Sequence, residues 1–266
     1  MVERQAKSRQ ERPSTVPVPE AVRPLLERIG RAADAQAVPA YAVGGCVRDW
    51  LLGQDELVDL DVMVEGDGIA FANALARELA IGVMAHEQFG TATLTLNESF
   101  SPSAAELCTT RIDIASARKE LYAAPASYPS VQPGQLRDDL LRRDFTINAM
   151  AMALNPARFG MLLDPFGGRD DLERRLLRIM HPKSFLDDPS RILRAARFAP
   201  RFGCRLEPTT EAALKRAIAH DLLSKLNRGR LRRELQRMTE EPDPVACLRW
   251  LSRWLAIRPG AKSRAR

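Results

Sequence analysis

The chain has 266 residues, 45% of them hydrophobic, which is enough for one or two domains with a sizeable core. No apolar run reaches the ~18 residues of a membrane-spanning helix, so no membrane partner is expected. The net charge of +6 is unevenly distributed: residues 1–141 carry 13 basic and 20 acidic residues, and residues 142–266 carry 27 and 14. A basic half fits a phosphate-bearing partner, although a merely soluble helical surface has the same composition.

Both ends of the chain are polar. Residues 1–20 contain prolines and lack the apolar stretch of a secretory signal, so we predict a disordered N-terminal arm. Residues 258–266 have the same character and are predicted to form a disordered basic tail. The four cysteines show neither paired nor zinc-like spacing, which favours reduced thiols in a cytoplasmic protein.

The first structured motif covers residues 41–53 and predicts a short strand, a diglycine turn and a helix that ends at Gly53. Gly44 and Gly45 allow close approach of a ligand to the main chain and offer N–H groups to phosphates. Arg48, on the helix, is expected to face the same site. An ordinary tight turn explains the two glycines equally simply.

Two carboxylates alternate with apolar residues in the next strand. Asp59 and Asp61 are spaced to project from one face of a strand, while Leu60 and Val62 pack on the other. Two anions held this close favour a cation between them, and hard carboxylate oxygens suit Mg²⁺. The alternative is a solvent-facing acidic strand, against which the apolar character of the strand argues.

A helix and two further strands follow. Asp67 is predicted to cap a helix, and residues 91–96 and 111–115 alternate as strands do. In the last of these, Asp113 points away from Ile112 and Ile114. Asp113 is therefore either a third carboxylate beside the metals or a simple exposed acid. The apolar stripe of the helix comprises Ile69, Phe71, Ala74, Leu75 and Leu79.

From about residue 170 the pattern is helical. The first helical residues are predicted to include Leu172, Leu176, Leu177, Ile179 and Met180, and further helices are expected around residues 192–198, 212–218, 231–238 and 245–255. Four arginines crowd one stretch and are candidate RNA phosphate contacts, although a solvated helix face is the commoner explanation. They are Arg228, Arg230, Arg232 and Arg233.

Asp188 and Arg191 are spaced i, i+3, so on a helix they share a face. A carboxylate accepts from an exocyclic amine and a guanidinium donates to a ring nitrogen or carbonyl, a combination that suits both cytosine and adenine. Uracil and guanine would leave the carboxylate unsatisfied, which is costly in a dry site. The competing interpretation is an intrahelical salt bridge.

Together these residues resemble the DNA polymerase β-like nucleotidyltransferase superfamily, and more closely the bacterial (class II) tRNA nucleotidyltransferase/poly(A) polymerase family. The resemblance runs from roughly residue 38 to 203 and continues more weakly to about 255. The matching motifs occur in the order of the family. They occupy residues 44–49, 59–61, 142–150, 164–168 and 187–198.

The resemblance implies a role for each matching residue. Asp59 and Asp61 match metal-binding catalytic aspartates, with Asp113 as the third catalytic candidate, and Gly44, Gly45 and Arg48 match the turn that holds the triphosphate. Residues 116–140 resemble a flexible loop that is linked in the family to a switch in nucleotide specificity. The residues that resemble ribose- and base-contacting positions are Arg143, Asp144, Asn148, Asp188, Arg191 and Arg194.

The resemblance also implies an α+β fold. We predict a nucleotidyltransferase head at residues 21–155, with a mixed sheet and flanking helices, and an all-α, RNA-binding neck at residues 156–257. The implied activity is template-independent addition of CMP and/or AMP to the tRNA 3′ end, with Mg²⁺ and with ATP and/or CTP. Alternatives are a poly(A) polymerase on other RNA and a truncated, non-catalytic RNA- or nucleotide-binding relative. Family members usually continue with helical domains that grip tRNA. Three alternatives follow: a minimal surface holds tRNA, a second subunit or a partner enzyme supplies the missing region, or the chain is truncated.

Overall fold

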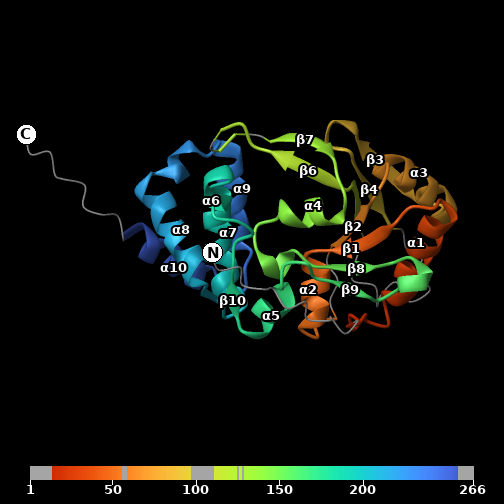
Figure 1. The fold of residues 1–266 in the computed structure, drawn as a ribbon, viewed down its shortest axis with the longest axis horizontal. Helices are drawn as coiled ribbons and strands as arrows, with labels where there is room; N and C mark the ends of the chain where they lie inside the picture. The colour runs from red at the N-terminus through yellow and green to blue at the C-terminus, as the bar shows by residue number, and fades with distance from the viewer. Residues whose placement is uncertain (1–13, 56–58, 97–110, 125, 128, 257–266) are drawn as a thin grey trace, which may run out of the picture.

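The computed structural model describes residues 14–55, 59–96, 111–124, 126–127 and 129–256. Its main feature is a seven-stranded sheet in the order β3-β4-β5-β2-β1-β8-β9 (Figure 1). β2 pairs with β5 in parallel and the other neighbours are antiparallel, so the predicted mixed sheet is confirmed. The strands are β1 (Ala40–Val43), β2 (Leu60–Val64), β3 (Gly82–His86), β4 (Thr91–Thr95), β5 (Arg111–Ser116), β8 (Ala151–Ala153) and β9 (Leu162–Leu163).

One face of the sheet is closed by helices. Leu60, Val62 and Val64 are buried on this face, in one hydrophobic cluster with residues of α1 (Arg23–Ala35), α2 (Gly45–Leu51) and α3 (Gly68–Leu79). The predicted cap of α3 is confirmed, because Asp67 accepts hydrogen bonds from two main-chain N–H groups of the first turn. The period-two pattern of β2 therefore fixes which side of the sheet faces this core.

The other face is only partly covered. Its smaller hydrophobic cluster includes Tyr41, Met63 and three alanines, packed under α4 (Leu136–Leu141). Asp61 lies on this face because it is two residues from Met63 on β2. Small side chains and a short helix leave the carboxylate accessible to solvent.

A two-stranded antiparallel ribbon of β6 (Arg118–Leu121) and β7 (Ser130–Pro133) stands apart from the sheet. Figure 1 shows it extending from the sheet toward the helical part of the molecule. Near its end the Ala126 N–H donates to the Leu186 carbonyl at 3.1 Å. The ribbon therefore bridges the two parts of the chain.

The C-terminal part is mostly helical, as predicted, but short strands interrupt it. Leu176 and Leu177 form β10, which pairs in parallel with β11 (Arg205–Leu206), and Ile179 forms a bridge with Phe145. The expectation that Leu176, Leu177, Ile179 and Met180 lie in a first helix is therefore wrong. Arg175 has a φ of 52°, which a helix cannot continue. The helices are α5 (Gly168–Glu173), α6 (Ser184–Asp187), α7 (Ser190–Arg201), α8 (Pro208–Ala219), α9 (Arg228–Thr239) and α10 (Pro244–Ala256). Short 3₁₀ turns are η1 (Glu87–Phe89), η3 (Thr146–Asn148), η4 (Pro156–Arg158) and η5 (Leu222–Lys225).

The two parts share one core. The cluster that buries β2 continues into α7 and α10 through Ile192 and Trp254. The sheet itself runs past the predicted head boundary at residue 155, since β9 is its last strand. Within the described residues, no helix is long and apolar enough to cross a membrane.

Residues 14–20 differ from the predicted disordered arm. Val16 and Val18 are buried in the main core, and the Val16 N–H donates to the Gly160 carbonyl at 2.8 Å. The two valines alternate as strand residues do, which explains why this short stretch packs beside β9. Residues 1–13 and the predicted tail at 258–266 lie outside the described residues.

Val16→Ala tests this packing. Loss of two buried methyl groups is expected to lower the free energy of unfolding by roughly 1–3 kcal/mol, measured by urea denaturation. Val131→Ala, at a position that is 52% exposed, is the matched control and is expected to change it by less than about 0.5 kcal/mol. Equal, small effects of both changes would show that residues 14–18 do not belong to the core.

Candidate active site

The carboxylates meet on adjacent strands. β2 and β5 pair in register with Asp61 directly opposite Asp113, so both side chains leave the sheet on the same face. Asp59 immediately precedes β2 and is exposed. Desolvation raises the pKa of Asp61; the Arg143 guanidinium opposes this shift, and the charges of Asp113 and Asp59 add to it. Asp61 thus has two carboxylates and the Arg143 guanidinium in its surroundings.

Both carboxylate oxygens of Asp113 have partners within the protein. Its Oδ1 accepts from the Thr93 hydroxyl at 2.6 Å, and its Oδ2 lies 2.7 Å from Arg111 Nη2. In the described parts of the chain, no three His, Cys, Asp or Glu side chains are grouped to hold a metal ion. The donor chemistry still fits a hard cation at Asp59 and Asp61, because both offer carboxylate oxygens and neither is buried away from solvent. Asp113 as a third ligand stays a prediction.

The diglycine turn lies next to Arg143. Gly44 has a φ of 81°, and a Cβ at this position would collide with the Arg143 guanidinium. Gly45 begins α2. Arg143 Nε is buried with no hydrogen-bond partner among the described residues, while its Nη2 lies 3.1 Å from Asp139 Oδ2. The turn and a partly unsatisfied guanidinium thus lie together near Asp61.

Arg48 lies beside the diglycine turn, with Nη2 3.6 Å from the place of a Cβ at Gly45, and is engaged within the protein. Its guanidinium makes two hydrogen bonds to Asp49, at 2.8 and 2.9 Å, and donates to the Asn148 side chain. It also lies over the Phe202 ring, 4.3 Å from the centroid. With only 6% of its side chain exposed, Arg48 connects α2 to the η3 turn and α7. Its contact with a triphosphate stays a prediction.

Asp144 and Asn148 are also engaged within the protein. Asp144 accepts from the Phe145 N–H at 2.7 Å, from Asn148 Nδ2 at 3.0 Å and from Arg194 Nε at 2.6 Å. All but 6% of Asp144 is buried. Asp144, Asn148 and Arg194 therefore form a joint between head and neck. Of the residues predicted to contact the ribose, Arg143 is the one that lies near the carboxylates.

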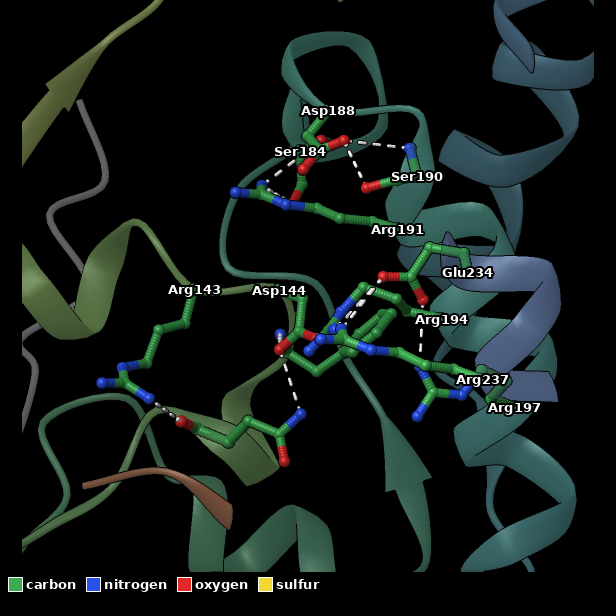
Figure 2. Close-up of polar contacts among 12 residues, drawn as sticks. Arg143, Asp144, Ser184, Asp188, Ser190, Arg191, Arg194, Arg197, Glu234 and Arg237 are labelled. Carbon is green, nitrogen blue, oxygen red and sulfur yellow. Dashed lines mark hydrogen bonds and ion pairs between the residues drawn. The ribbon is translucent and has the colours of Figure 1, made fainter. Parts of the chain in front are cut away.

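Asp188 and Arg191 do not share a helix as predicted. Asp188 is extended, with φ −135° and ψ 94°, and lies between α6 and α7. Its Oδ1 accepts from the Ser190 hydroxyl and N–H, and its Oδ2 lies 2.6 Å from Arg230 Nη2. Arg191 donates to Ser184 and to the Arg142 carbonyl, the latter at 2.7 Å. Figure 2 shows Asp188 and Arg191 together beside Ser184, without an ion pair between them.

The basic stretch of α9 has two sides. Arg228, Arg232 and Arg233 are exposed as predicted, whereas Arg230 is held by Asp188. The sequence patterns did not identify the buried acid on the inner side, Glu234, which pairs with Arg197 at 2.9 Å (Figure 2). The available signal was a single glutamate inside a run of arginines.

Gly44→Ala and Gly53→Ala form a matched pair, since both glycines have positive φ. Nothing lies within 4 Å of a Cβ at Gly53, so that variant is expected to lose only about 1–2 kcal/mol of unfolding free energy to backbone strain. Gly44→Ala is expected to lose more, roughly 3 kcal/mol, because φ 81° with ψ −120° is a conformation that residues other than glycine rarely adopt, and the Arg143 guanidinium must also move. Urea denaturation measures both. Equal losses would contradict a specific need for glycine at position 44.

Asp139 generates a pH-dependent prediction. Burial alone would raise the pKa of Asp139, but the charges of Arg142 and Arg143 outweigh burial and hold that pKa below its ordinary value. A carboxyl group with a depressed pKa stabilises the fold above its ordinary pKa and loses this contribution as the pH falls through the folded-state value.

Asp139→Asn is therefore expected to cost roughly 3 kcal/mol of unfolding free energy at pH 7. The difference from wild type should shrink as the pH drops below about 4. Urea denaturation over this range is the measurement, with exposed Asp34→Asn as the control that has little effect at any pH. A cost that does not vary with pH would contradict the ion pairs at Asp139.

Comparisons with known proteins agree with this geometry. A family model described as the Poly A polymerase head domain matches residues 40–178. Over 224 residues the chain is 40% identical to the A-adding tRNA nucleotidyltransferase of Geobacter sulfurreducens, covering 84% of this chain and 24% of that protein. It is also 40% identical over 220 residues to the CC-adding tRNA nucleotidyltransferase of Deinococcus radiodurans, with coverages of 82% and 55%.

The fold matches as well. A solved structure of a CCA-adding enzyme in apo form II superposes with a TM-score of 0.81 at 42% identity, covering 90% of this chain and 54% of that one. The chain thus spans 24% to 55% of the length of these proteins. The extent of the family match and the level of identity lead to one conclusion: the chain belongs to the family of proteins that carry the Poly A polymerase head domain.

Proposed function

We propose that the protein is a template-independent nucleotidyltransferase that adds CMP and/or AMP to the 3′ end of tRNA. The observation that carries the proposal is the register of β2 and β5, which sets Asp61 opposite Asp113 with Asp59 just before β2, together with Arg143 against the Gly44 turn. Similarity to A-adding, CC-adding and CCA-adding enzymes supports the same activity and leaves the choice between C and A open.

Asp59 and Asp61 are the residues that would hold Mg²⁺. When bound, the ion supplies a lowered pKa for the RNA 3′-hydroxyl and charge stabilisation at the α-phosphate. Arg143 provides a fixed positive charge for the triphosphate, because Asp139 orients one end of its guanidinium and its Nε has no partner among the described residues. The turn at Gly44 lets the phosphates approach the main chain closely.

Asp188 and Arg191 are proposed to choose the base. The contacts of Arg191 within the described residues use three of its five N–H donors, which leaves donors for a base edge. Asp188 is held at both oxygens but keeps acceptor capacity for an exocyclic amine. On the Watson–Crick edge, cytosine and adenine offer that amine next to a ring-nitrogen acceptor, whereas uracil and guanine present a carbonyl in its place.

The exposed arginines of α9 are proposed to contact RNA phosphates. Arg228, Arg232 and Arg233 lie on the basic C-terminal part of the chain and face solvent. Such contacts would give salt-dependent, sequence-independent affinity. We also infer a cytoplasmic location, supported by the buried free thiols of Cys46, Cys204 and Cys247.

A second candidate is poly(A) addition to another RNA. It is favoured by the matching family model and by an Asp188–Arg191 arrangement that accepts adenine. The same chemistry would then act on a different primer, and the two candidates are separated by the RNA that is extended.

The purified chain is to be incubated with Mg²⁺ and tRNAs ending before CCA, after C and after CC, with each nucleoside triphosphate supplied separately. Use of CTP on the first two and of ATP on the third establishes CCA addition. Use of ATP only on the CC-ended tRNA establishes A addition, and use of CTP alone establishes CC addition. No extension of any tRNA, but ATP-dependent extension of an unstructured RNA, would favour the poly(A) candidate.

Asp61→Asn is expected to lower the rate of incorporation by roughly 10²- to 10³-fold or more, because a neutral amide replaces a charged cation ligand. RNA binding, measured by gel shift, should be unchanged. Asp67→Asn is the control: it lies six residues along the chain, and asparagine caps a helix as well as aspartate does. Full activity of Asp61→Asn would exclude the metal-binding assignment.

A further inference from the structure

The β6–β7 ribbon touches the elements that hold both proposed base-reading residues. At its far end Ala126 donates to the Leu186 carbonyl, two residues before Asp188. At its near end the Arg118 guanidinium donates to the Phe89 carbonyl at 3.2 Å, which fixes the start of β6 to the head. The ribbon is thus attached to the head at one end and to the neck at the other, as its path in Figure 1 shows.

Glu120 of β6 is the charged centre of this attachment. Only 8% of its side chain is exposed, and both of its oxygens are used. Oε1 lies 3.1 Å from Arg118 Nη2 and 3.2 Å from Arg142 Nη1, while Oε2 accepts from the Tyr122 hydroxyl at 2.8 Å. A nearly buried carboxylate between two guanidiniums has a fixed geometry, because loss of either partner leaves charge poorly compensated.

Arg142 connects Glu120 to Arg191. Its guanidinium is held between Glu120 and Asp139, the latter at 2.7 Å. Its main-chain carbonyl accepts from Arg191 Nη2 at 2.7 Å. The contacts therefore run without a break from Glu120, through Arg142, to the guanidinium proposed to meet the base. The other hydrogen bonds of Arg191 go to Ser184, so among the described residues Arg142 is its one hydrogen-bond partner on the head side.

Tyr122 places the same carboxylate close to the base-reading pair. Burial and the neighbouring Glu120 raise the pKa of Tyr122, and the charges of Arg191 and Asp188 also act on this phenol. Glu120 therefore binds the side chain of Arg142, whose carbonyl accepts from Arg191, and accepts from the Tyr122 hydroxyl.

We propose that Glu120 is a positioning residue for base selection: it holds Arg142 where the Arg142 carbonyl orients Arg191. This inference rests on the proposed function, since Arg191 must meet a base for its orientation to matter. A purely structural ion pair at Glu120 would stabilise the fold but leave the choice among nucleotides unchanged. A positioning role and a purely structural role of Glu120 therefore predict the same loss of stability on substitution but a different nucleotide selectivity.

The test compares Glu120→Gln with Glu207→Gln. Glu207 is similarly enclosed, with 11% of its side chain exposed, and pairs with Arg178 away from Arg191. For each variant, KM and kcat are measured with the nucleotide that the wild type uses and with UTP, and the melting temperature is recorded. Equilibrium affinities for ATP, CTP and UTP without RNA give a second measure of selectivity that does not need turnover.

For Glu120→Gln we expect a roughly ten-fold loss of discrimination against UTP, mainly through KM for the correct nucleotide, with a smaller change in kcat. Glu207→Gln should lower the melting temperature to a similar degree and keep wild-type discrimination. Arg142→Met breaks the same link from its other side and should reproduce the loss. The double variant Glu120→Gln/Arg142→Met should be no less selective than either single variant.

Wild-type selectivity in Glu120→Gln, with only a lower melting temperature, would overturn the positioning role while leaving the proposed function intact. Selective nucleotide binding by a wild type that extends no RNA would count against the proposed function, and the binding ratios would still decide the role of Glu120. Failure of the wild type to prefer ATP or CTP over UTP in binding and in turnover would overturn both.

Discussion

The buried carboxylate of Asp144 is the interaction on which the arrangement of the molecule depends. It accepts from the head through the Phe145 N–H and Asn148, and from the neck through Arg194. The Arg194 guanidinium and the hydrogen bond from Asn148 overcome the effect of burial and hold the pKa of Asp144 below its ordinary value. A charge enclosed in this way tolerates little rearrangement, because a displaced partner leaves the buried carboxylate poorly compensated.

This joint fixes the two halves of the candidate site relative to each other. Arg143, the neighbour of Asp144, is held against the Gly44 turn near Asp61. Arg191 lies one turn before Arg194 on α7, so the same helix carries the joint and the proposed base contact. Selection of a base by protein side chains requires such rigidity, since a displacement of about 1 Å weakens both hydrogen bonding and reactivity.

Local patterns predicted the head well. The alternation at Leu60–Asp61 and Ile112–Asp113 gave the strands and the face of each carboxylate, because side-chain direction in a strand depends only on spacing. Gly44 was predictable for the same reason, as a positive φ is a local property.

Other features of the structure depend on a proline that follows the residue, or on contacts with residues far away in the sequence. Asp188 leaves the helix because it precedes Pro189, and proline disfavours the helical conformation in the residue before it. The orientation of Arg48 follows from Asn148, 100 residues away, and the pairing of Arg197 with Glu234 spans 37 residues. The spacing of residues within one strand or helix cannot predict such contacts. The motifs therefore supplied the candidate site residues but not the ion pairs that hold them.

A double-mutant cycle on Asp144→Asn and Arg194→Gln, measured by urea denaturation at pH 7, tests the role of the joint most directly. The account predicts a coupling free energy of roughly 1.5–3 kcal/mol between the two positions, because each variant removes the same buried contact. A coupling near zero, with additive losses, would show that Asp144 and Arg194 act independently and that the head and neck are held together by other contacts.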